Sequence, residues 1–482
     1  MEQLRDRDLR SIQQARDLVL ASKAAQRSFA EFDQVSIDRI VGAMAAAAEK
    51  ASDRLAKMAA EETGFGRYED KIIKNLFASK AVYEYIKDMK TIGIIREDKE
   101  EKIVEIGSPV GVIAAMIPST NPTSTTIYKA LIALKAGNGI VFSPHPAAVK
   151  CTMEAAALLH EAALQAGAPE GLIGCMDLPT MEGSRELMAH QDVALILATG
   201  GSALVKAAYS SGTPALGVGP GNVPAYIEGS ADIPMAVKRI FESKTFDNGT
   251  ICASEQAVIT EKGIEERVRE EIIKQGGYFL RGEEISRVAA VIQKPGGGLN
   301  SKIVGQSAKT IAAMAGISVP EETRVLLCEQ KGVGKDYPFS MEKLSPILAF
   351  YVEEDWHRAC ERCIELLNYG GLGHSLVIHS NNEAIIREFA LKKPVYRILV
   401  NTSSSHGAIG ATTSLAPSLT LGCGTIGGSA TSDNVSPMHL INKKRMVYGI
   451  REVEDLKSKA KGLDERDLEY ITRLVLEQLK KM

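Results

Sequence analysis

The spacing of hydrophobic residues divides the chain into segments that predict different secondary structure. Over residues 5–90 apolar and alanine residues recur at intervals of three and four, a spacing typical of amphipathic helices. An example is the set Ile37, Ile40, Val41 and Met44. The charged run 96–102 then leads into residues 102–106, whose alternating pattern is typical of a half-exposed strand. We therefore predict a helical N-terminal region followed by such a strand.

From Val110 onwards, short apolar runs alternate with longer segments of helical periodicity. The predicted strands are residues 110–117, 140–142, 172–176, 193–198 and 223–227. The predicted helices between them are residues 125–136, 147–166, 182–190 and 202–210. This alternation predicts a parallel, doubly wound sheet with helices on both faces. A second α/β unit is predicted between residues 231 and 421, with strands at 256–260, 347–352, 375–379 and 397–401.

The C-terminal region has a different pattern. After Gly428 the sequence is polar as far as a basic run at 443–445, and residues 457–462 indicate a polar linker. Asp464 can cap a helix that continues to residue 482. One stripe of that helix is apolar: Leu468, Ile471, Val475, Leu479 and Met482. Such a stripe packs on the chain's own core or binds a partner.

The composition is that of an ordinary globular protein with two or three domains. Of the 482 residues 45% are hydrophobic, which supplies a large core and argues against disorder. With 57 Lys and Arg against 60 Asp and Glu, no overall charge favours nucleic acid or an anionic membrane. The N-terminus lacks an apolar signal, and the longest apolar stretch is shorter than the roughly 20 residues of a membrane helix. We expect a cytoplasmic protein with reduced thiols and with neither nucleic acid nor membrane as a partner.

One of the seven cysteines is a candidate nucleophile. Cys360 and Cys363 form a CxxC pair with no second pair nearby, so we predict that both pack in the core from a helix over 356–367 and that no metal site is present. Cys252 differs, because it lies between a turn signal at 247–249 and a predicted strand. Backbone N–H groups at such a junction can lower a thiol pKa and hold an oxyanion. From these residues alone, a nucleophile and an inert thiol both stay open.

Three glycine-rich segments are suited to close approach by a ligand. Residues 422–427 match G-x-G-x-x-G, but no apolar helix follows and no acidic residue stands at the expected distance. We predict a tight loop that lines a cleft, in which the role of Cys423 stays ambiguous. Residues 199–202 follow a predicted strand and open a helix, as either a phosphate site or a plain turn would. Residues 217–222 suit either ligand contact or a tight turn.

Longer motifs resemble those of CoA-acylating aldehyde dehydrogenases. Residues 246–256, Phe-Asp-Asn-Gly-Thr-Ile-Cys-Ala-Ser-Glu-Gln, resemble the nucleophile segment of that family, and residues 118–125 resemble its oxyanion loop. Four further segments follow in the family's order: residues 143–146, 198–202, 217–222 and 419–424. The likeness covers about residues 10–450. It is strongest to the acetaldehyde and propionaldehyde dehydrogenases of bacterial microcompartments.

The resemblance implies an α/β, aldehyde dehydrogenase-like fold with two Rossmann-type domains and a small oligomerisation strand extension. The implied parts are an NAD-binding domain (1–98 and 108–228), a catalytic domain (229–427), oligomerisation strands (99–107 and 428–450) and a linker with a C-terminal amphipathic helix (451–482). The strands would build a homodimer or homotetramer. The terminal helix would act as an encapsulation peptide that binds a microcompartment shell protein, with docking on its own core as the alternative.

The resemblance also implies the site residues and the cofactors NAD and coenzyme A. By matching position, Cys252 is the nucleophile and Asn121 the oxyanion donor. The residues implied to bind NAD are Pro118, Thr120, Ser143, His145, Thr199, Gly200, Gly201, Ser202, Gly219 and Glu342. Among them Ser143 would hold the adenosine ribose, residues 199–202 the pyrophosphate, and Glu342 the nicotinamide ribose.

Two departures from hydrolytic aldehyde dehydrogenases bear on function. No acidic residue lies within 217–222, where those relatives place the glutamate that activates water. A thiol such as that of CoA, with a pKa of about 8.5, needs less activation. Those relatives also have Pro-x-Asn, whereas Asn121 stands three residues after Pro118, so an ungapped alignment places Thr120 at the oxyanion position. We favour Asn121, because a side-chain amide is the better donor.

The implied activity is the NAD-dependent, CoA-acylating oxidation of a short-chain aldehyde, propionaldehyde or acetaldehyde, to acyl-CoA through a cysteine thioester. The implied location is the cytoplasm, inside a bacterial microcompartment. One alternative is a hydrolytic aldehyde dehydrogenase that releases the free acid. Another is a non-catalytic binding protein on the same fold.

Overall fold

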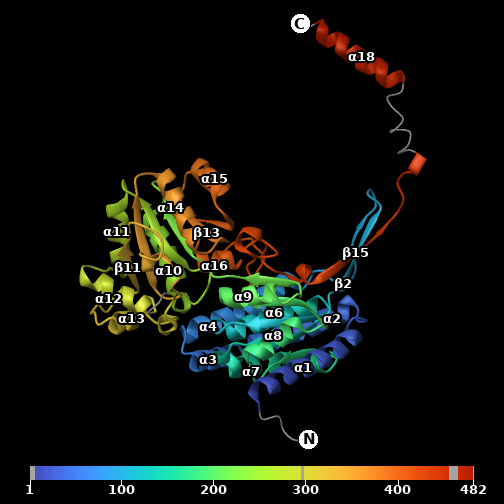
Figure 1. Ribbon diagram of the computed structural model, residues 1–482, viewed down its shortest axis with the longest axis horizontal. Coiled ribbons are helices and arrows are strands. Elements are labelled where there is room, and N and C mark those ends of the chain that lie inside the picture. The colour runs from blue at the N-terminus through green and yellow to red at the C-terminus, as the bar shows by residue number, and fades with distance from the viewer. Residues whose placement is uncertain (1–5, 295–297, 455–464, 481–482) are drawn as a thin grey trace.

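The computed structural model describes residues 6–294, 298–454 and 465–480, and consists of two α/β lobes with an extended arm (Figure 1). Within these described ranges the strands form a five-stranded, a seven-stranded and a three-stranded sheet. The first of these sheets lies in the first lobe and the second in the second lobe, while the third forms the arm.

The first lobe is built on a parallel sheet in the order β5-β4-β3-β6-β7. Its strands are β3 (Val112–Ile117), β4 (Gly139–Pro144), β5 (Ile173–Cys175), β6 (Val193–Thr199) and β7 (Ala215–Val218). Its helices are α1 (Arg7–Phe29), α2 (Gln34–Lys50), α3 (Ser52–Thr63), α4 (Tyr68–Leu76), the π-helical η1 (Phe77–Ala81), α5 (Val82–Ile86), α6 (Pro122–Lys135), α7 (Val149–Gln165), α8 (Met181–Ala189) and α9 (Ser202–Tyr209). Ile113 and Ala115 of β3 pack towards α6 and α7, whereas Val112 and Ala114 pack towards α1 and α8. The sheet is therefore covered on both faces, which confirms the predicted doubly wound architecture.

The second lobe holds a larger parallel sheet in the order β10-β11-β12-β9-β8-β13-β14. Its strands are β8 (Val223–Ile227), β9 (Glu255–Glu261), β10 (Gly277–Phe279), β11 (Val325–Glu329), β12 (Ile347–Glu353), β13 (Gly373–His379) and β14 (Val395–Val400). Its helices are α10 (Ile233–Thr245), α11 (Glu265–Lys274), α12 (Glu283–Ile292), α13 (Ala308–Met314), α14 (Trp356–Tyr369), α15 (Glu383–Lys392) and α16 (Ser404–Ala408). The predicted second α/β unit is thus confirmed. Asp232 and Asp355 cap α10 and α14, because their carboxylates accept hydrogen bonds from free N–H groups of the first turn.

The chain crosses between the lobes earlier than predicted. The strand 223–227 is β8, which pairs with β9 and β13 in the second sheet, so the crossing lies at 219–222 instead of at 228. One of the two edge strands of the first sheet is β7, a four-residue strand too short for its pattern to show. A short buried apolar run does not indicate which sheet it will join, and this explains the error.

The arm joins segments that lie far apart in the sequence. β2 (Ile103–Pro109) pairs antiparallel with β1 (Gly93–Asp98) on one side and with β15 (Ile441–Val447) on the other. The predicted strand at 102–106 is confirmed as β2, but part of the charged run before it belongs to β1. Charged residues suit β1 because most of its side chains are exposed. Pairing of subunits through the arm stays a prediction.

The C-terminal helix α18 (Glu465–Leu479) stands away from both lobes (Figure 1). Its described side chains are all exposed, including Leu468, Ile471 and Val475 of the predicted stripe. The predicted linker 457–462, the predicted cap Asp464 and the stripe residue Met482 lie outside the described residues.

Two further predictions concern cysteines and membranes. Cys360 and Cys363 are both buried on α14, as predicted. In the described ranges no cluster of three or more His, Cys, Asp or Glu side chains could hold a metal ion. Across the same ranges no helix combines the length and the apolar character needed to cross a membrane.

Candidate active site

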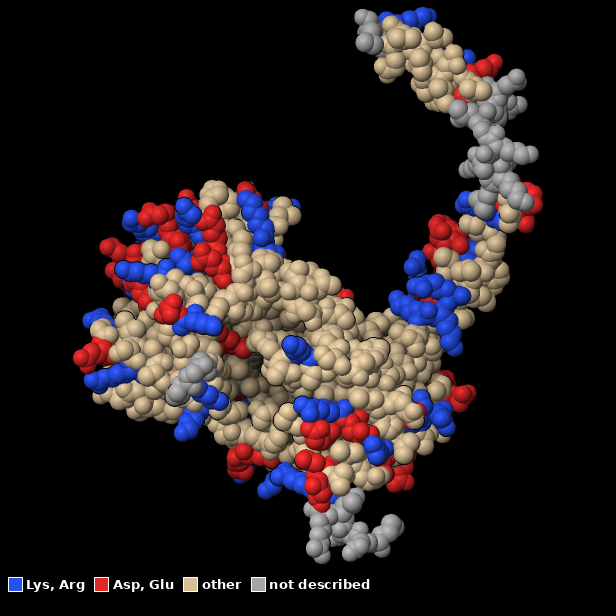
Figure 2. Space-filling model, viewed as in Figure 1, with Lys and Arg blue, Asp and Glu red and all other residues tan. Residues whose placement is uncertain are grey.

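The predicted site residues lie where the edges of the two parallel sheets face each other. Asn121 follows the carboxyl end of β3, Ser143 is the penultimate residue of β4, and Thr199 is the last residue of β6. Cys252 precedes the amino end of β9 in the other lobe. Figure 2 shows that the surface is hollowed between the lobes and that the rim of the hollow is mostly uncharged. Carboxyl ends of parallel strands are the usual place for a ligand site in α/β folds.

Cys252 is half-buried and follows a tight turn, Phe246–Gly249. Asp247 and Asn248 in this turn have φ angles of 49° and 51°, in the left-handed region that few residues adopt. The carboxylate of Asp247 fixes the turn, because it accepts hydrogen bonds from the backbone N–H of Arg67 at 2.6 Å and from Thr250 Oγ1 at 2.7 Å. The expected turn before the thiol is therefore present, and buried polar contacts hold it.

The surroundings of Cys252 raise the pKa of its thiol, contrary to the expectation that nearby amides lower it. Burial, with a smaller contribution from the carboxylate of Glu342, raises the pKa of Cys252 to about 12, while Arg397 and the Cys252 backbone N–H act in the opposite direction. Burial also raises the pKa of Glu342 to about 7. In this structure the Cys252 thiol is therefore protonated at neutral pH. The charge of Glu342 accounts for part of its raised pKa.

Replacing Glu342 with glutamine should accelerate alkylation of Cys252 by iodoacetamide at pH 8 by about three- to tenfold. Glu342 ionises as the pH rises through about 7, and its charge then opposes the thiolate; the neutral glutamine does not. Second-order alkylation rates at pH 6 and pH 8, with Cys252→Ala as the blank for other thiols, measure the effect. At pH 6 the unmodified protein and Glu342→Gln should be alkylated at similar rates. A slower reaction of Glu342→Gln at pH 8 would contradict this electrostatic account.

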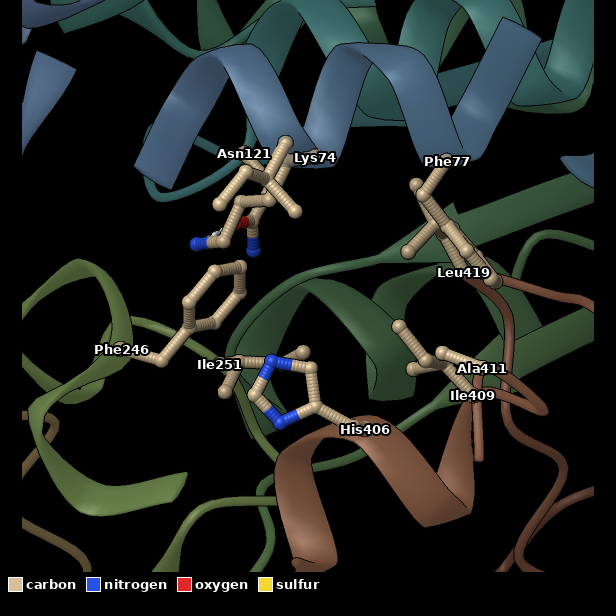
Figure 3. Close-up of a pocket in the computed structure, with 10 residues that line it drawn as sticks. Lys74, Phe77, Asn121, Phe246, Ile251, His406, Ile409, Ala411 and Leu419 are labelled. Atoms are coloured by element: carbon tan, nitrogen blue, oxygen red, sulfur yellow. Dashed lines mark hydrogen bonds between the residues drawn. The ribbon is translucent and has the colours of Figure 1, made fainter. Parts of the chain in front are cut away.

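Asn121 directly precedes α6, and Pro122 occupies the first turn of that helix. Its Oδ1 accepts a hydrogen bond from Lys74 Nζ at 2.6 Å, and its Nδ2 donates to Thr120 Oγ1 at 3.2 Å. Thr120 is therefore a partner of the Asn121 amide in this structure. Asn121 and Lys74 point into the same pocket from the first lobe (Figure 3).

This pocket has an apolar lining and is open to solvent on one side. Its lining residues are Ile73, Lys74, Phe77, Asn121, Phe246, Ile251, His406, Ile409, Ala411 and Leu419. Phe246 and His406 lie opposite Asn121 and approach each other with ring centroids 4.6 Å apart (Figure 3). Ile251 brings the pocket next to the nucleophile segment, so the pocket is suited to the apolar part of a small substrate.

The carboxyl ends of β6 and β7 in the first sheet have the features of a phosphate site. Thr199 Oγ1 is buried and has no hydrogen-bond partner among the described residues. Gly201 precedes α9, whose start has no side-chain cap in the described part of the chain. A Cβ atom on Gly201 or Gly219 would meet no atom within 4 Å, so both backbones border open space. These residues fit the pyrophosphate of a dinucleotide, and Glu342 Oε1 accepts from the Gly221 N–H at 3.1 Å nearby.

The remaining residues implied to bind NAD lie on the same strand edge. Ser143 is buried, and its hydroxyl oxygen lies 2.9 Å from Ser184 Oγ on α8. His145 is exposed, and its Nδ1 accepts from the Ala147 N–H. Pro118 follows β3 and is half-buried. In the 422–427 segment, residues 425–427 form a 3-10 turn that does not lead into an α-helix, as predicted, and Cys423 is buried.

Sequence reasoning missed two residues that the fold brings to this site, Lys74 and His374. Lys74, on α4, contacts Asn121 and Asp247. His374 is the second residue of β13, and its buried Nε2 has no partner in the described residues. Burial lowers its pKa to about 3, so the ring is neutral. A Cβ atom on Gly221 would contact both the His374 ring and the Cys252 carbonyl. No local pattern marks Lys74 or His374, because their neighbours come from distant segments.

Comparison with known proteins agrees with this geometry. Residues 8–284 match the model of the aldehyde dehydrogenase family. The crystal structure of an acetylating aldehyde dehydrogenase from Geobacillus thermoglucosidasius is 56% identical, with a TM-score of 0.92 over 93% of this chain and 99% of that one. A propionaldehyde dehydrogenase from the fucose utilisation microcompartment of Clostridium phytofermentans is 30% identical, with a TM-score of 0.82 over 91% of this chain and 98% of that one.

A curated relative is longer than this chain. The bifunctional aldehyde-alcohol dehydrogenase of Escherichia coli K12 is 50% identical over 432 residues, which are 89% of this chain and 48% of that protein. The chain thus spans about half the length of the curated aldehyde-alcohol dehydrogenases that it matches. On the matching family model and these similarities, the chain belongs to the aldehyde dehydrogenase family.

Proposed function

We propose that this chain oxidises acetaldehyde or propionaldehyde to the corresponding acyl-CoA, with NAD as cofactor, through a thioester on Cys252. One observation carries the proposal: Asn121 and Ile251, the residue next to the half-buried Cys252, line one apolar pocket, and the loop 217–222 offers no carboxylate to activate water. The acetylating activity named for the Geobacillus relative supports it.

The strand edge of the first lobe would hold NAD, which supplies the acceptor for the hydride of the substrate. The backbone and hydroxyls of residues 199–202 would bind the pyrophosphate, and Ser143 would contact the adenosine ribose. Glu342 would bind the nicotinamide ribose. Occupation of Glu342 by that ribose would weaken its effect on the Cys252 thiol, so that cofactor binding would favour the thiolate.

Cys252 would lose its proton to solvent and add its sulfur to the aldehyde carbon. The resulting oxyanion would accept hydrogen bonds from Asn121 Nδ2 and from the backbone N–H of Cys252. Loss of hydride from the carbon re-forms the carbonyl and leaves a thioester. The CoA thiolate would then add to the thioester carbon, and the Cys252 thiolate would leave. The CoA thiol would lose its proton to solvent, because burial lowers the pKa of the nearby His374 ring to about 3 and makes it a weak base.

Assays with and without CoA test the proposal. Acetaldehyde and propionaldehyde should give one rapid turnover of NADH without CoA and continuous turnover with it, with acyl-CoA as the product. Continuous turnover without CoA, with the free acid as product, would favour the hydrolytic alternative. Binding of NAD without any aldehyde-dependent NADH would favour a non-catalytic protein.

The same assays should show rejection of aldehydes that carry a carboxylate, such as succinic semialdehyde, by about 100-fold or more in kcat/KM. The pocket lining is apolar, the Lys74 ammonium is already paired with buried Asp247, and burial lowers the pKa of His406. A substrate carboxylate in this pocket would thus lose its hydration shell without forming an ion pair, at a cost of several kcal/mol in binding free energy. Equal kcat/KM values for propionaldehyde and succinic semialdehyde would contradict this use of the pocket.

We further propose that α18 binds a microcompartment shell protein and that the arm pairs subunits into a dimer or tetramer in the bacterial cytoplasm. The exposed apolar side chains of α18 and the microcompartment origin of the Clostridium neighbour support the first part. The exposed edge strands β1 and β15 support the second. A fluorescent reporter fused to residues 462–482 should co-localise with shells, and diffuse fluorescence would count against the helix as a targeting segment.

A further inference from the structure

The orientation of the Asn121 carboxamide decides whether it can stabilise an oxyanion. One end of the group, Nδ2, carries two N–H donors, and the other, Oδ1, is only an acceptor. An oxyanion needs the donor end, and the acceptor end would repel it. Asn121 lies at the half-exposed start of α6, where no side-chain cap bond of that helix fixes it in the described structure. Another group must therefore select the orientation.

Lys74 makes that selection. Its ammonium has donors and no acceptor, so the amide atom that it contacts at 2.6 Å must be the oxygen, Oδ1. This contact turns Nδ2 the other way. One Nδ2 hydrogen goes to Thr120 Oγ1 at 3.2 Å, and the second is left for a ligand. Because Asn121 lines the pocket, this donor is available to a ligand bound there.

The position of Lys74 is itself fixed from the nucleophile segment. Its side chain is 5% exposed, and its ammonium donates to the carboxylate of Asp247 and to the Thr250 carbonyl, 3.1 Å away. Asp247 is fully buried, and it stands in the turn that precedes Cys252. One ammonium therefore connects the oxyanion loop of the first lobe with the segment of the second lobe that carries the thiol.

We propose that Lys74 is a positioning residue that orients the Asn121 amide towards the substrate oxygen and couples its placement to that of Cys252. This inference rests on the proposed function for the identity of the substrate. Lys71 provides a matched comparison, because it also contacts Asp247, at 3.0 Å, but reaches the Thr120 backbone carbonyl instead of the Asn121 side chain.

The test is a double-mutant cycle of Lys74→Met and Asn121→Ala, with Lys71→Met as the matched control. The rate is the burst of p-nitrophenolate from p-nitrophenyl acetate, in which Cys252 attacks the ester carbonyl, p-nitrophenolate leaves and an acetyl thioester remains. Lys74→Met should slow this burst by about 10- to 100-fold, but by less than about threefold when Asn121 is already alanine. Lys71→Met should have a clearly smaller effect than Lys74→Met.

Lys74→Gln should recover part of the lost rate, because its side-chain amide can still donate to Asn121 Oδ1. Circular dichroism and thermal unfolding check that each variant is folded. If Lys74→Met does not fold, Lys74→Gln takes its place in the double-mutant cycle. Equal fold losses from the Lys74 substitution with and without Asn121, or equal effects of the Lys71 and Lys74 substitutions, would overturn the proposal. The ester assay needs neither NAD nor CoA, so failure of the proposed function would appear separately, in the aldehyde assays.

Discussion

Aldehyde-dependent NADH formation should fall by at least about 10⁴-fold when Cys252 is replaced by alanine. The substitution removes the sulfur that would form the thioester, while Asn121, Glu342 and the NAD edge keep their positions. Stopped-flow fluorescence of NADH in the absence of CoA measures the loss directly. Intact-protein mass spectrometry should detect an acyl adduct on the unmodified protein after exposure to acetaldehyde and NAD, and none on Cys252→Ala.

Cys423 supplies the control for this experiment. It is 2% exposed, and its Sγ lies 3.5 Å from the Leu421 carbonyl, so it is a buried thiol of the glycine loop. Cys423→Ala should retain most of the turnover and the full adduct. Appreciable turnover by Cys252→Ala, or an adduct that persists in Cys252→Ala and disappears in Cys423→Ala, would show that the nucleophile has been assigned to the wrong cysteine.

Replacement of Asn121 by alanine should slow aldehyde oxidation by about 100- to 1000-fold, the usual cost of one oxyanion donor. The loss should fall on kcat, because the amide would bind the charge that develops on the oxygen. Thr120→Val is the matched comparison, because the ungapped alignment would give Thr120 this role. It removes a hydroxyl that accepts from Asn121 at 3.2 Å, and we expect a loss of about tenfold or less. A larger loss in Thr120→Val than in Asn121→Ala would transfer the oxyanion role to Thr120.

Periodicity and motif order predicted most of the fold. Alternating strands and helices were sufficient for two parallel sheets, because buried strands and amphipathic helices leave regular local patterns. The pattern could not indicate which sheet residues 223–227 join, since a buried strand has the same composition in either lobe. The strand β1 was hidden by its charges, which the exposed arm tolerates.

For the candidate site, sequence motifs indicated Cys252, Asn121, Glu342 and residues 199–202, and the fold brings these to facing sheet edges. The pKa of the Cys252 thiol could not be predicted correctly from these motifs. Backbone amides near a turn suggested a lowered pKa, but burial and the charge of Glu342, which is distant in the chain, raise it. Desolvation depends on everything that surrounds a group, and a local motif describes only its chain neighbours.

The sequence by itself therefore determined the doubly wound architecture, the family and the identity of the candidate nucleophile, because each leaves a pattern within a continuous segment. Only the tertiary structure decided how that nucleophile is supported. Lys74 is separated from Asn121 by 47 positions and from Asp247 by 173, yet its ammonium contacts both side chains. Hydrogen bonds and charges act through space over a few ångströms, so the partners of a buried group are set by how the lobes pack.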